Sequence, residues 1–410
     1  MNGSTTAGAR QTPEDAVSVG FEGPVHSPIR TASAQALALA LQATRARTLG
    51  LLQAWQSALP DLSVPPLAGM NPPLWEWGHI AWFQEWWTVR NRQRLLGTRS
   101  ACSASDFDAS VRPDADALYN SSEIAHDSRW ALALPDLAAT QAYLEQVLQR
   151  SLTHLAALAQ TEHADSDQAL YFWRLVVQHE DMHNEASVYM AQALGLALPQ
   201  ALCERGGAAA QLPSPKGPLR VPAQVHRLGH EGPGFAFDNE CQAQGVSLAA
   251  FSIDAQAVTW ARYLPFVQAT GHTLAPHVRQ AQGVWQAQRF GQWQALDLQA
   301  PAVHLNAHDA QAWCQWAGRR LPSEAEWECA AQQPGFVWGQ VWEWTASDFA
   351  PFPGFEPHPY RDYSAPWWHS HRVLRGACAA TSGHVADVRY RNFFVPERRD
   401  IFAGFRSVAL

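Results

Sequence analysis

Hydrophobic positions in the first half of the chain repeat with the spacing of helices. Residues 31–57, 135–160 and 165–195 carry apolar side chains three and four positions apart and are rich in good helix formers. A fourth pattern follows two prolines and covers residues 74–96, whereas residues 98–128 are rich in Asp and Ser and indicate a loop. Four helices of this kind predict an up-and-down bundle.

The pattern changes after residue 200. Residues 201–217 are rich in Gly, Pro and small side chains, which is typical of a linker. Short strand-like runs and turns follow, interrupted by short helical patterns at 257–268 and 308–317. We therefore predict an α+β protein, with a helical domain at residues 31–200 and a turn-rich, strand-containing domain at residues 218–410.

The first 30 residues mix Gly, Ser, Thr, Pro and acidic side chains. They have neither the basic start nor the apolar core of a signal peptide, so residues 1–30 are predicted to be a disordered tail. No run of 18 or more apolar residues predicts a membrane span. The six cysteines are scattered without a CxxC spacing, which favours a cytoplasmic location and argues against a thiolate zinc site.

The amino-acid composition further limits the class of protein that this chain can be. The chain has 410 residues, of which 47% are hydrophobic and 16% charged, and this apolar content excludes a wholly disordered protein. The net charge is −8 without any block of like charges, so we expect no nucleic-acid partner. Tryptophan is unusually frequent at 19 residues, which indicates large cores or an aromatic-lined pocket.

The clearest chemical motif is HEDMH at residues 179–183. Residues four apart share one face of a helix, so His179 and His183 point the same way and form half of a first-row metal site. The same letters match HExxH, which would make the protein a zinc peptidase with Glu180 as the general base. Two histidines on a long helix can also be present without binding any ligand.

A third ligand has to come from another helix, and His79 is the best candidate. It lies among five tryptophans, between residues 75 and 87, where we expect little water. Metal sites in bundles combine side chains from facing helices, although a single buried histidine is more often a hydrogen-bonded core residue. Three histidines without a carboxylate leave coordination positions open, which suits either iron and O2 or a hydrolytic metal.

Four stretches of the second half resemble the formylglycine-generating-enzyme (sulfatase-modifying) fold. They are GRRLPSEAEWE at 318–328, VWEWT at 341–345, RVLRG at 372–376 and FAGFR at 402–406. The resemblance implies a C-type-lectin-like domain with little regular secondary structure. Formylglycine formation itself requires a cysteine pair, and Cys378 has no clear partner.

A helical bundle joined to this domain resembles the ergothioneine-type sulfoxide synthases, whose first part is a DinB-like four-helix bundle. The resemblance covers residues 35–410 and implies that Fe(2+) is held by His79, His179 and His183. In that family iron and O2 join a sulfur donor to the imidazole of hercynine, which is trimethylated histidine.

The chain departs from the family at the expected catalytic phenols. Where members that use γ-glutamylcysteine carry tyrosines, this chain has Phe349 and Phe352, and cysteine-using members have tyrosines where residues 120–123 read NSSE. A phenyl ring cannot donate a proton. Met182 also replaces the family's glutamine within HxxQH. No catalytic residue besides the metal ligands is assigned.

The resemblance also implies a set of substrate contacts. Asn392, Phe393 and Phe394 stand where the family has Asn-Trp-Asp around hercynine, and Arg398 matches an arginine that pairs with the donor carboxylate. Trp342 belongs to the VWEWT stretch and is, with Phe349 and Phe352, a candidate for contact with the trimethylammonium group.

The altered pocket most resembles the selenoneine synthase branch. We therefore expect a non-haem iron enzyme that uses O2 to join hercynine C2 to the selenium of a selenosugar through a selenoxide adduct. Two alternatives stay open: sulfoxide synthesis from hercynine and cysteine or γ-glutamylcysteine, and a metal-free binding or scaffold protein. The sugar and the oligomeric state are not determined by the sequence.

Overall fold

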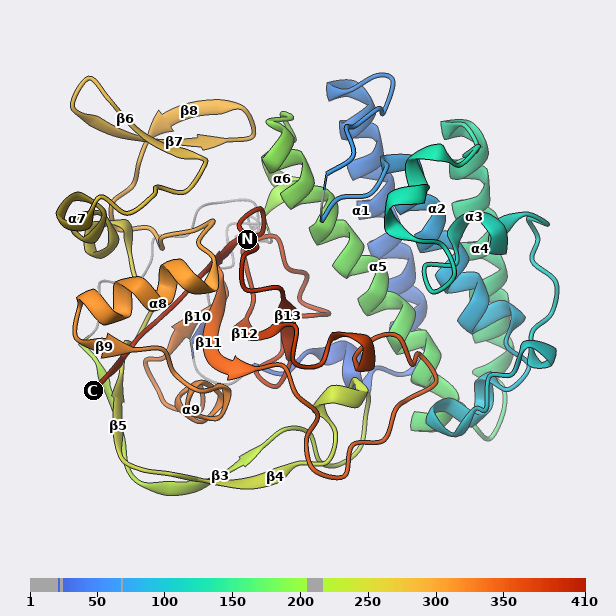
Figure 1. Cartoon of the computed structure of the whole chain (residues 1–410). Coiled ribbons are helices and arrows are strands. Elements are labelled where there is room, and N and C mark those ends of the chain that lie inside the picture. The colour runs from blue at the N-terminus through green and yellow to red at the C-terminus, as the bar shows by residue number, and fades with distance from the viewer. Residues whose placement is uncertain (1–20, 23–24, 68, 205–216) are drawn as a thin grey trace, which may run out of the picture.

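The computed structural model describes residues 21–22, 25–67, 69–204 and 217–410. A helical half and a strand-containing half lie side by side, drawn in blue to green and in yellow to red in Figure 1. This arrangement confirms the predicted α+β class.

The long helices of the first half begin where the sequence offers a start signal. Ser33, Asp136 and Ser166 each accept a hydrogen bond from the backbone N–H three residues later, and the remaining helix opens on a proline. Gly195, with φ of 69°, ends the last of them. The four helices are α1 (Ala34–Ala58), α2 (Pro73–Gln84), α4 (Leu137–Leu158) and α5 (Asp167–Leu194).

The helix predicted for residues 74–96 is shorter in the structure. α2 ends at Gln84 and continues as a π-helical turn, Glu85–Arg90, followed by a 3-10 segment, Arg94–Arg99. The fully buried Glu85 carboxylate accepts hydrogen bonds from the backbone of Val111 and from side chains including that of Tyr143. These tertiary contacts fix the chain where helical propensity alone would continue the α-helix.

The segment predicted as a loop also contains regular structure. Within residues 98–128 the short helix α3 (Ala115–Tyr119) packs against α2. Helix α1 packs against α4 and α5, and α2 packs against α4, which gives the predicted bundle.

Two four-stranded sheets form the centre of the second half. One has the order β13-β12-β11-β14 and the other the order β2-β5-β15-β9. Strands of the first sheet are β11 (Trp342–Asp348), β12 (Arg372–Gly376), β13 (Asn392–Phe394) and β14 (Ala403–Gly404). Those of the second are β2 (Leu219–Val221), β5 (Phe251–Ile253), β9 (Arg319–Arg320) and β15 (Val408–Ala409).

Smaller elements surround these sheets. The predicted short helices are present as α7 (Trp260–Thr270) and α8 (Ala307–Trp316), and the GRRLPSEAEWE stretch adds α9 (Glu324–Ala330). A hairpin and a three-stranded sheet lie at the edges of this half in Figure 1. Their strands are β3 (Gln224–Leu228), β4 (Gln244–Leu248), β6 (Val278–Ala281), β7 (Val284–Arg289) and β8 (Gln292–Ala295).

The prediction of a disordered tail over residues 1–30 is wrong for its described part. Residues 1–20 and 23–24 lie outside the described residues, but β1 (Phe21–Glu22) pairs with β10 (Val337–Trp338). The buried Arg30 guanidinium contacts Glu240 at 2.7 Å and Asp387 at 3.2 Å. Because buried charges require partners, this triad holds the segment on the second half.

The predicted linker also begins too early. Helix α6 (Gln200–Cys203) occupies its first residues, and the Cys203 side chain is buried because α6 packs against α1. Residues 205–216 lie outside the described residues, and β2 starts at Leu219.

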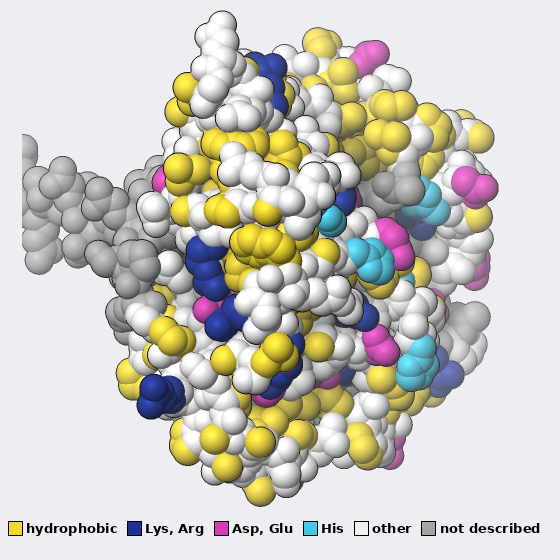
Figure 2. All heavy atoms as spheres, turned by 60° about the vertical axis from the view of Figure 1, so that its left-hand side comes forward, with side chains coloured by type: hydrophobic (Ala, Val, Ile, Leu, Met, Phe, Trp, Pro, Cys, Tyr) yellow, Lys and Arg dark blue, Asp and Glu magenta, His cyan; other side chains and the backbone are white. Residues whose placement is uncertain are grey.

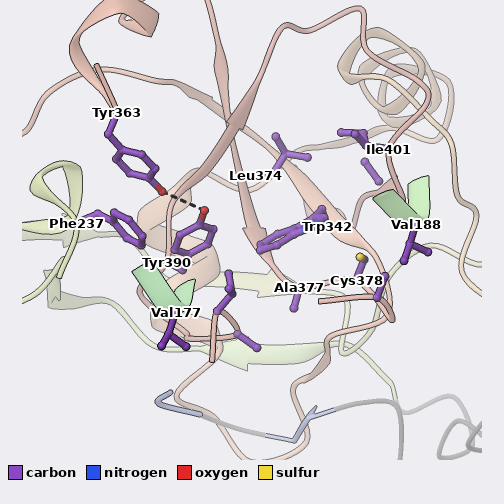
Figure 3. Close-up of a cluster of buried hydrophobic side chains, with 14 of the residues drawn as sticks. Val177, Val188, Phe237, Trp342, Tyr363, Leu374, Ala377, Cys378, Tyr390 and Ile401 are labelled. Carbon is purple, nitrogen blue, oxygen red and sulfur yellow. Dashed lines mark hydrogen bonds between the residues drawn. The ribbon is translucent and has the colours of Figure 1, made fainter. Parts of the chain in front are cut away.

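One hydrophobic core runs through both halves. In Figure 3 Val177 and Val188 of α5 lie in the same cluster as Trp342, Leu374 and Cys378 of the second half, and all are buried. Burial of apolar area at this junction stabilises the pair of domains as one body.

The surface of the second half is chemically mixed. On the face drawn in Figure 2, apolar patches alternate with separate basic and acidic side chains, and no broad field of one charge covers it. Among the described residues, no helix is long and apolar enough to cross a bilayer.

Candidate metal centre

The structure brings the three predicted histidines together. His79 comes from α2, and His179 and His183 come from consecutive turns of α5. One ring nitrogen from each lies within 4.8 Å of the other two, and the Nε2 atoms of His179 and His183 are 3.1 Å apart. Helix α5 supplies two ligands at the i, i+4 spacing that the HEDMH motif predicts.

Hydrogen bonds to the outer nitrogens orient two of these rings. The Nδ1 atom of His79 is 2.8 Å from the backbone carbonyl of Tyr119, and Nδ1 of His183 is 2.5 Å from the Glu76 carboxylate. Both acceptors place the proton on Nδ1, which leaves the Nε2 lone pair free for a metal. Sequence reasoning missed Glu76, although its position three residues before His79 was a signal.

The Glu76 carboxylate is ionised despite its burial. Burial alone would raise its pKa, but His183 and a hydrogen bond from Asn71 at 2.6 Å outweigh this and hold the pKa below its usual range. An ionised carboxylate behind an imidazole increases the ligand's basicity.

Burial keeps two of the histidines neutral. His79 is 2% exposed, and burial, reinforced by the nearby His183, lowers the pKa of His79 to about 3. Burial, with the other two histidines, also takes the pKa of His179 well below its ordinary value. Neutral imidazoles are the form that binds metals, so His79 and His179 need no deprotonation step near neutral pH.

Aromatic rings enclose the cluster. Trp75 stacks on His79 with ring centroids 4.8 Å apart, and Phe83 stacks on His179 at 3.5 Å, both at an angle of 7°. Such stacking fixes the ring planes and keeps water away from the ligands. No carboxylate joins the cluster among the described residues. Three imidazole nitrogen donors fit a first-row divalent metal with open coordination positions.

The peptidase alternative does not fit this geometry. Both carboxylate oxygens of Glu180 are occupied, because Arg45 donates to them at 2.8 and 3.0 Å and Thr48 donates at 2.6 Å. Glu180 is 2% exposed and belongs to the packing of α5 on α1. A carboxylate held in this way is not available as a general base for a metal-bound water.

Met182 and Trp342 lie at the junction of the two halves. Tyr390 donates a hydrogen bond to Met182 Sδ at 3.1 Å, and the Trp342 ring lies 5.7 Å from the Tyr390 ring. Figure 3 shows the Tyr390 and Tyr363 hydroxyls facing each other, at 3.1 Å. This pair of phenols therefore contacts α5 through Met182.

Phe349 and Phe393 form a second group of predicted contacts. Their rings stack at 4.0 Å, and Phe393 also contacts Tyr363. The Asn392 side chain accepts a hydrogen bond from the Phe393 backbone. Phe349 is completely buried, so any ligand contact on this side falls to Phe393 and Asn392, which are partly exposed.

The remaining predicted contacts have other partners in the structure. Phe352 packs with Leu228 and Ala325 in a separate small core, with a guanidinium over its ring. Arg398 is already paired with Asp400 at 2.9 Å and lies 4.5 Å from the Phe394 ring centroid. The positions of these residues in the sequence predicted contact with the substrate. The loop after β11 instead carries Phe352 into the small core with Leu228 and Ala325.

A phenol that the sequence reading overlooked lies close to the metal ligands. The Tyr360 ring is 6.4 Å from the His179 ring and 4.9 Å from Phe83. Burial raises the pKa of Tyr360 above its ordinary value, so the hydroxyl retains its proton. Tyr360 follows Phe352 by eight residues, outside the motif in which a tyrosine was expected.

A cavity of about 350 Å³ lies along these aromatic side chains, between the bundle and the second half. A hydrogen bond from Ser122 to Asp362 joins the two halves at its rim. Its volume is in the range of small-molecule sites. The lining residues are Trp82, Phe83, Trp86, Trp87, Ala101, Cys102, Asn120, Ser121, Ser122, Pro359, Tyr360, Arg361 and Asp362.

Two family models match the two halves. Residues 40–186 match the DinB superfamily, and residues 209–338 match the sulfatase-modifying factor enzyme 1-like domain. The chain is therefore a two-domain protein in which a DinB bundle precedes a sulfatase-modifying-factor-like domain.

Some relatives match this chain over most of its length. The chain is 27% identical to a hercynine oxygenase of Mycolicibacterium smegmatis and 28% identical to one of Mycobacterium tuberculosis, in each case over 91% of this chain and 98% of the relative. It is thus homologous to hercynine oxygenases in both domains, as the sequence motifs indicated.

A second set of relatives matches only the second half. The formylglycine-generating enzyme of Streptomyces coelicolor is 34% identical over 34% of this chain and 53% of its own length. All six cysteines of this chain are free, and Cys378 contacts Thr381 instead of a second cysteine. The pair of cysteines that formylglycine formation requires is therefore missing.

Proposed function

We propose that this chain is a non-haem iron(II), O2-dependent enzyme that forms a bond from selenium to C2 of the hercynine imidazole. His79, His179 and His183 would hold the iron. When bound there, iron would supply the site for O2 activation. The observation that carries the proposal is the cluster of three imidazoles, two of them buried and the third partly exposed, without a carboxylate, in a chain homologous to hercynine oxygenases.

The surrounding residues have defined roles in this proposal. Tyr119 and Glu76 orient the ligands, and the stacked aromatic rings exclude water. Asn392 and Phe393 would contact hercynine, whose trimethylammonium group gains roughly 0.5–2 kcal/mol from each aromatic face. Tyr360 is the phenol nearest to His179 in position to donate a proton.

We propose a selenosugar as the second substrate. The polar cavity residues near the bundle are Asn120, Ser121 and Ser122, which suit the hydroxyl groups of a sugar. Arg398, the expected partner of a donor carboxylate, is already paired with Asp400. Both features favour a neutral, hydroxyl-rich donor over an amino acid. The six free cysteines agree with a reducing, cytoplasmic location.

A second candidate is sulfoxide synthesis from hercynine and cysteine or γ-glutamylcysteine. The specific observation in its favour is the name of the full-length relatives, which are hercynine oxygenases. Arg361 and Asp362 at the cavity rim are also able to bind the two charged groups of an amino acid.

In the test, the iron-loaded protein receives hercynine and O2 together with a 1-selenosugar, cysteine or γ-glutamylcysteine, each in a separate parallel reaction. Product formation with the selenosugar, measured by mass spectrometry, is the expected result. Turnover only with a thiol would refute the selenium assignment and retain the reaction class. His179→Ala should abolish activity and iron binding, whereas Glu180→Gln should retain activity, which a peptidase with Glu180 as its general base would lose.

Metal analysis tests the scaffold alternative. After anaerobic reconstitution, we expect one iron per chain in the wild type and loss of that iron in His179→Ala. A wild-type chain that retains no iron would support a metal-free binding protein.

A further inference from the structure

A column of aromatic rings connects His79 to the cavity wall. His79 and Trp82 have ring centroids 5.7 Å apart, Trp82 and Trp86 are 5.3 Å apart, and Trp86 and Phe107 are 3.9 Å apart, all with interplanar angles of 33° or less. The spacing of residues 79, 82 and 86 keeps them on one side of α2 and of the π-helical turn that follows. The metal-binding role of the histidines does not require this column.

Trp82 is placed where an indole is easily oxidised. Its Nε1–H donates to the Asp116 carboxylate at 2.7 Å, and the same carboxylate is held by Arg90. The hydrogen bond from Arg90 is the main reason that the pKa of Asp116 lies below its usual value, so the group is anionic. The Asp116 oxygen at the indole N–H stabilises the positive charge that forms when the ring loses an electron, and Arg90, which pairs with both Asp116 oxygens, offsets part of this effect.

Trp86 is placed where the column meets solvent. It is partly exposed and lines the 350 Å³ cavity. The guanidinium of Arg90 lies 4.7 Å from its ring centroid and disfavours a lasting positive charge there. An oxidised Trp86 would therefore release its Nε1 proton and become a neutral radical that soluble reductants can reach.

We propose that Trp82 and Trp86 conduct electrons to the histidine cluster and protect it when an oxidant forms there without organic substrate. One electron passes from Trp82 to the oxidised iron, and one from Trp86 refills Trp82. Trp86 then loses its Nε1 proton to solvent, and a reductant of the thiol or ascorbate class returns one electron and one proton. The inference rests on the iron of the proposed function and not on the identity of the selenium or sulfur donor.

Trp87 provides a matched control. It lies on the same π-helical turn, lines the same cavity and is buried, as Trp82 is. Its ring stacks on Phe172 at 4.9 Å, and its Nε1 has no hydrogen-bond partner among the described residues. Between Trp87 and His179 stand Phe83, whose ring is far harder to oxidise than an indole, and Tyr360, whose ring lies 6.3 Å from Trp87 and 6.4 Å from His179. Trp87→Phe is therefore measured both alone and together with Tyr360→Phe.

The experiment treats the iron-loaded full chain with hydrogen peroxide in the absence of hercynine and of any donor. Freeze-quenched samples are measured by electron paramagnetic resonance, and oxidised residues are located by peptide mass spectrometry. We expect an indole radical and oxygen addition at Trp86 in the wild type. The zinc-loaded chain should show neither.

The variants distinguish electron transfer through Trp82 and Trp86 from unspecific oxidative damage. Trp82→Phe and Trp86→Phe should lose the radical and shift oxidation to the histidines of the proposed metal centre. Asp116→Asn should weaken the radical signal. Trp87→Phe should give the same radical signal as the wild type. Iron content and circular dichroism establish that each variant is folded, and Trp86→Phe should disturb the bundle least because Trp86 is partly exposed.

An unchanged radical in both Trp82→Phe and Trp86→Phe would overturn the inference, as would an equal loss in Trp87→Phe. Because no organic substrate is present, failure of the selenosugar assignment does not affect the result. Failure of the iron assignment itself would appear beforehand, in the metal analysis.

Discussion

At the scale of single residues, the candidate metal centre depends on groups behind the ligands. Glu76 is the clearest case, since it is 2% exposed, anionic, and hydrogen-bonded to His183 Nδ1 at 2.5 Å. Its two oxygens are divided between His183 and Asn71. A buried carboxylate in this position is what the proposed metal centre requires to orient His183.

Glu76→Gln should weaken iron binding without removing a ligand. The amide keeps the size of the side chain but not its charge, so iron affinity should fall by about 10–100-fold. Anaerobic titration with iron(II) measures this change. The matched control is Glu145→Gln on the exposed side of α4, which should leave the affinity unchanged. Equal iron affinities of Glu76→Gln and the wild type would show that the hydrogen bond between Glu76 and His183 does not orient a ligand.

His304 gives a pH dependence that is separate from the metal centre. Burial, reinforced by the nearby His277, lowers the pKa of His304 from 6.5 to about 3. Because the unfolded chain takes up this proton at higher pH than the folded one, stability is retained above pH 6.5 and lost as the pH falls toward 3. The loss from this group is at most about 1.4 kcal/mol per pH unit.

His304→Asn should reduce that acid sensitivity. Asparagine tolerates the φ of 61° at this position and retains an N–H donor for the carbonyl of Arg399, but it does not titrate. Urea unfolding between pH 7 and pH 4 measures the slope of stability against pH. An identical slope in the variant would contradict the assignment of the effect to His304.

At the scale of elements, α3 and α2 are built as a unit around the metal ligand. The carbonyl of Tyr119 at the end of α3 orients His79, and Asp116 of the same helix binds Trp82. This close approach requires a glycine on α2, because a Cβ added at Gly78 would lie 2.2 Å from the Tyr119 ring. Glycine at a helical position is otherwise unfavourable.

Gly78→Ala should therefore destabilise the protein by about 1–3 kcal/mol and weaken iron binding, as overpacking displaces α3. Gly50→Ala on α1 is the control, since the added Cβ meets only the flexible end of Leu202 at 3.3 Å. It should be neutral or stabilising by roughly 0.5–1 kcal/mol. Thermal unfolding and iron titration measure both; equal effects at the two glycines would contradict the argument.

At the scale of the whole molecule, α5 connects the two halves. It carries His179 and His183 on one side and, through Glu185, accepts a hydrogen bond from the Trp342 indole of β11 at 2.6 Å. Burial raises the pKa of Glu185 above its ordinary value. Asp181 of the same helix contacts His384 of the second half at 2.7 Å. The metal centre is thereby fixed relative to the proposed substrate contacts.

Trp342→Phe should uncouple the halves, because it removes the indole donor from the buried Glu185 and leaves it only the side chains of Thr381 and Cys378, at a cost of about 0.5–1.5 kcal/mol. Trp344→Phe is a matched control on the same strand, since its indole donates to Leu305 within the second half. Calorimetry should show one unfolding transition for the wild type and Trp344→Phe, and two for Trp342→Phe. A single transition in all three would show that this hydrogen bond does not couple the domains.

Much of the architecture was accessible from the sequence. The helices of the bundle were predicted from apolar periodicity and start signals, both of which are local properties of the chain. The histidine pair at 179 and 183 was predicted because a helix has a fixed pitch. The fold of the second half came from resemblance alone, because short strands with long irregular connections leave little periodic signal.

The sequence by itself thus determined the helices, the order of the domains and the types of the metal-binding side chains. Tertiary structure decided which polar groups meet them: Glu76 on His183, Arg45 on Glu180 and Tyr360 beside His179. It also attached the segment around Arg30, 210 residues away from its partner Glu240, where a tail was predicted. Pairing of buried charges over such separations depends on where the chain returns in space, and no local pattern encodes it.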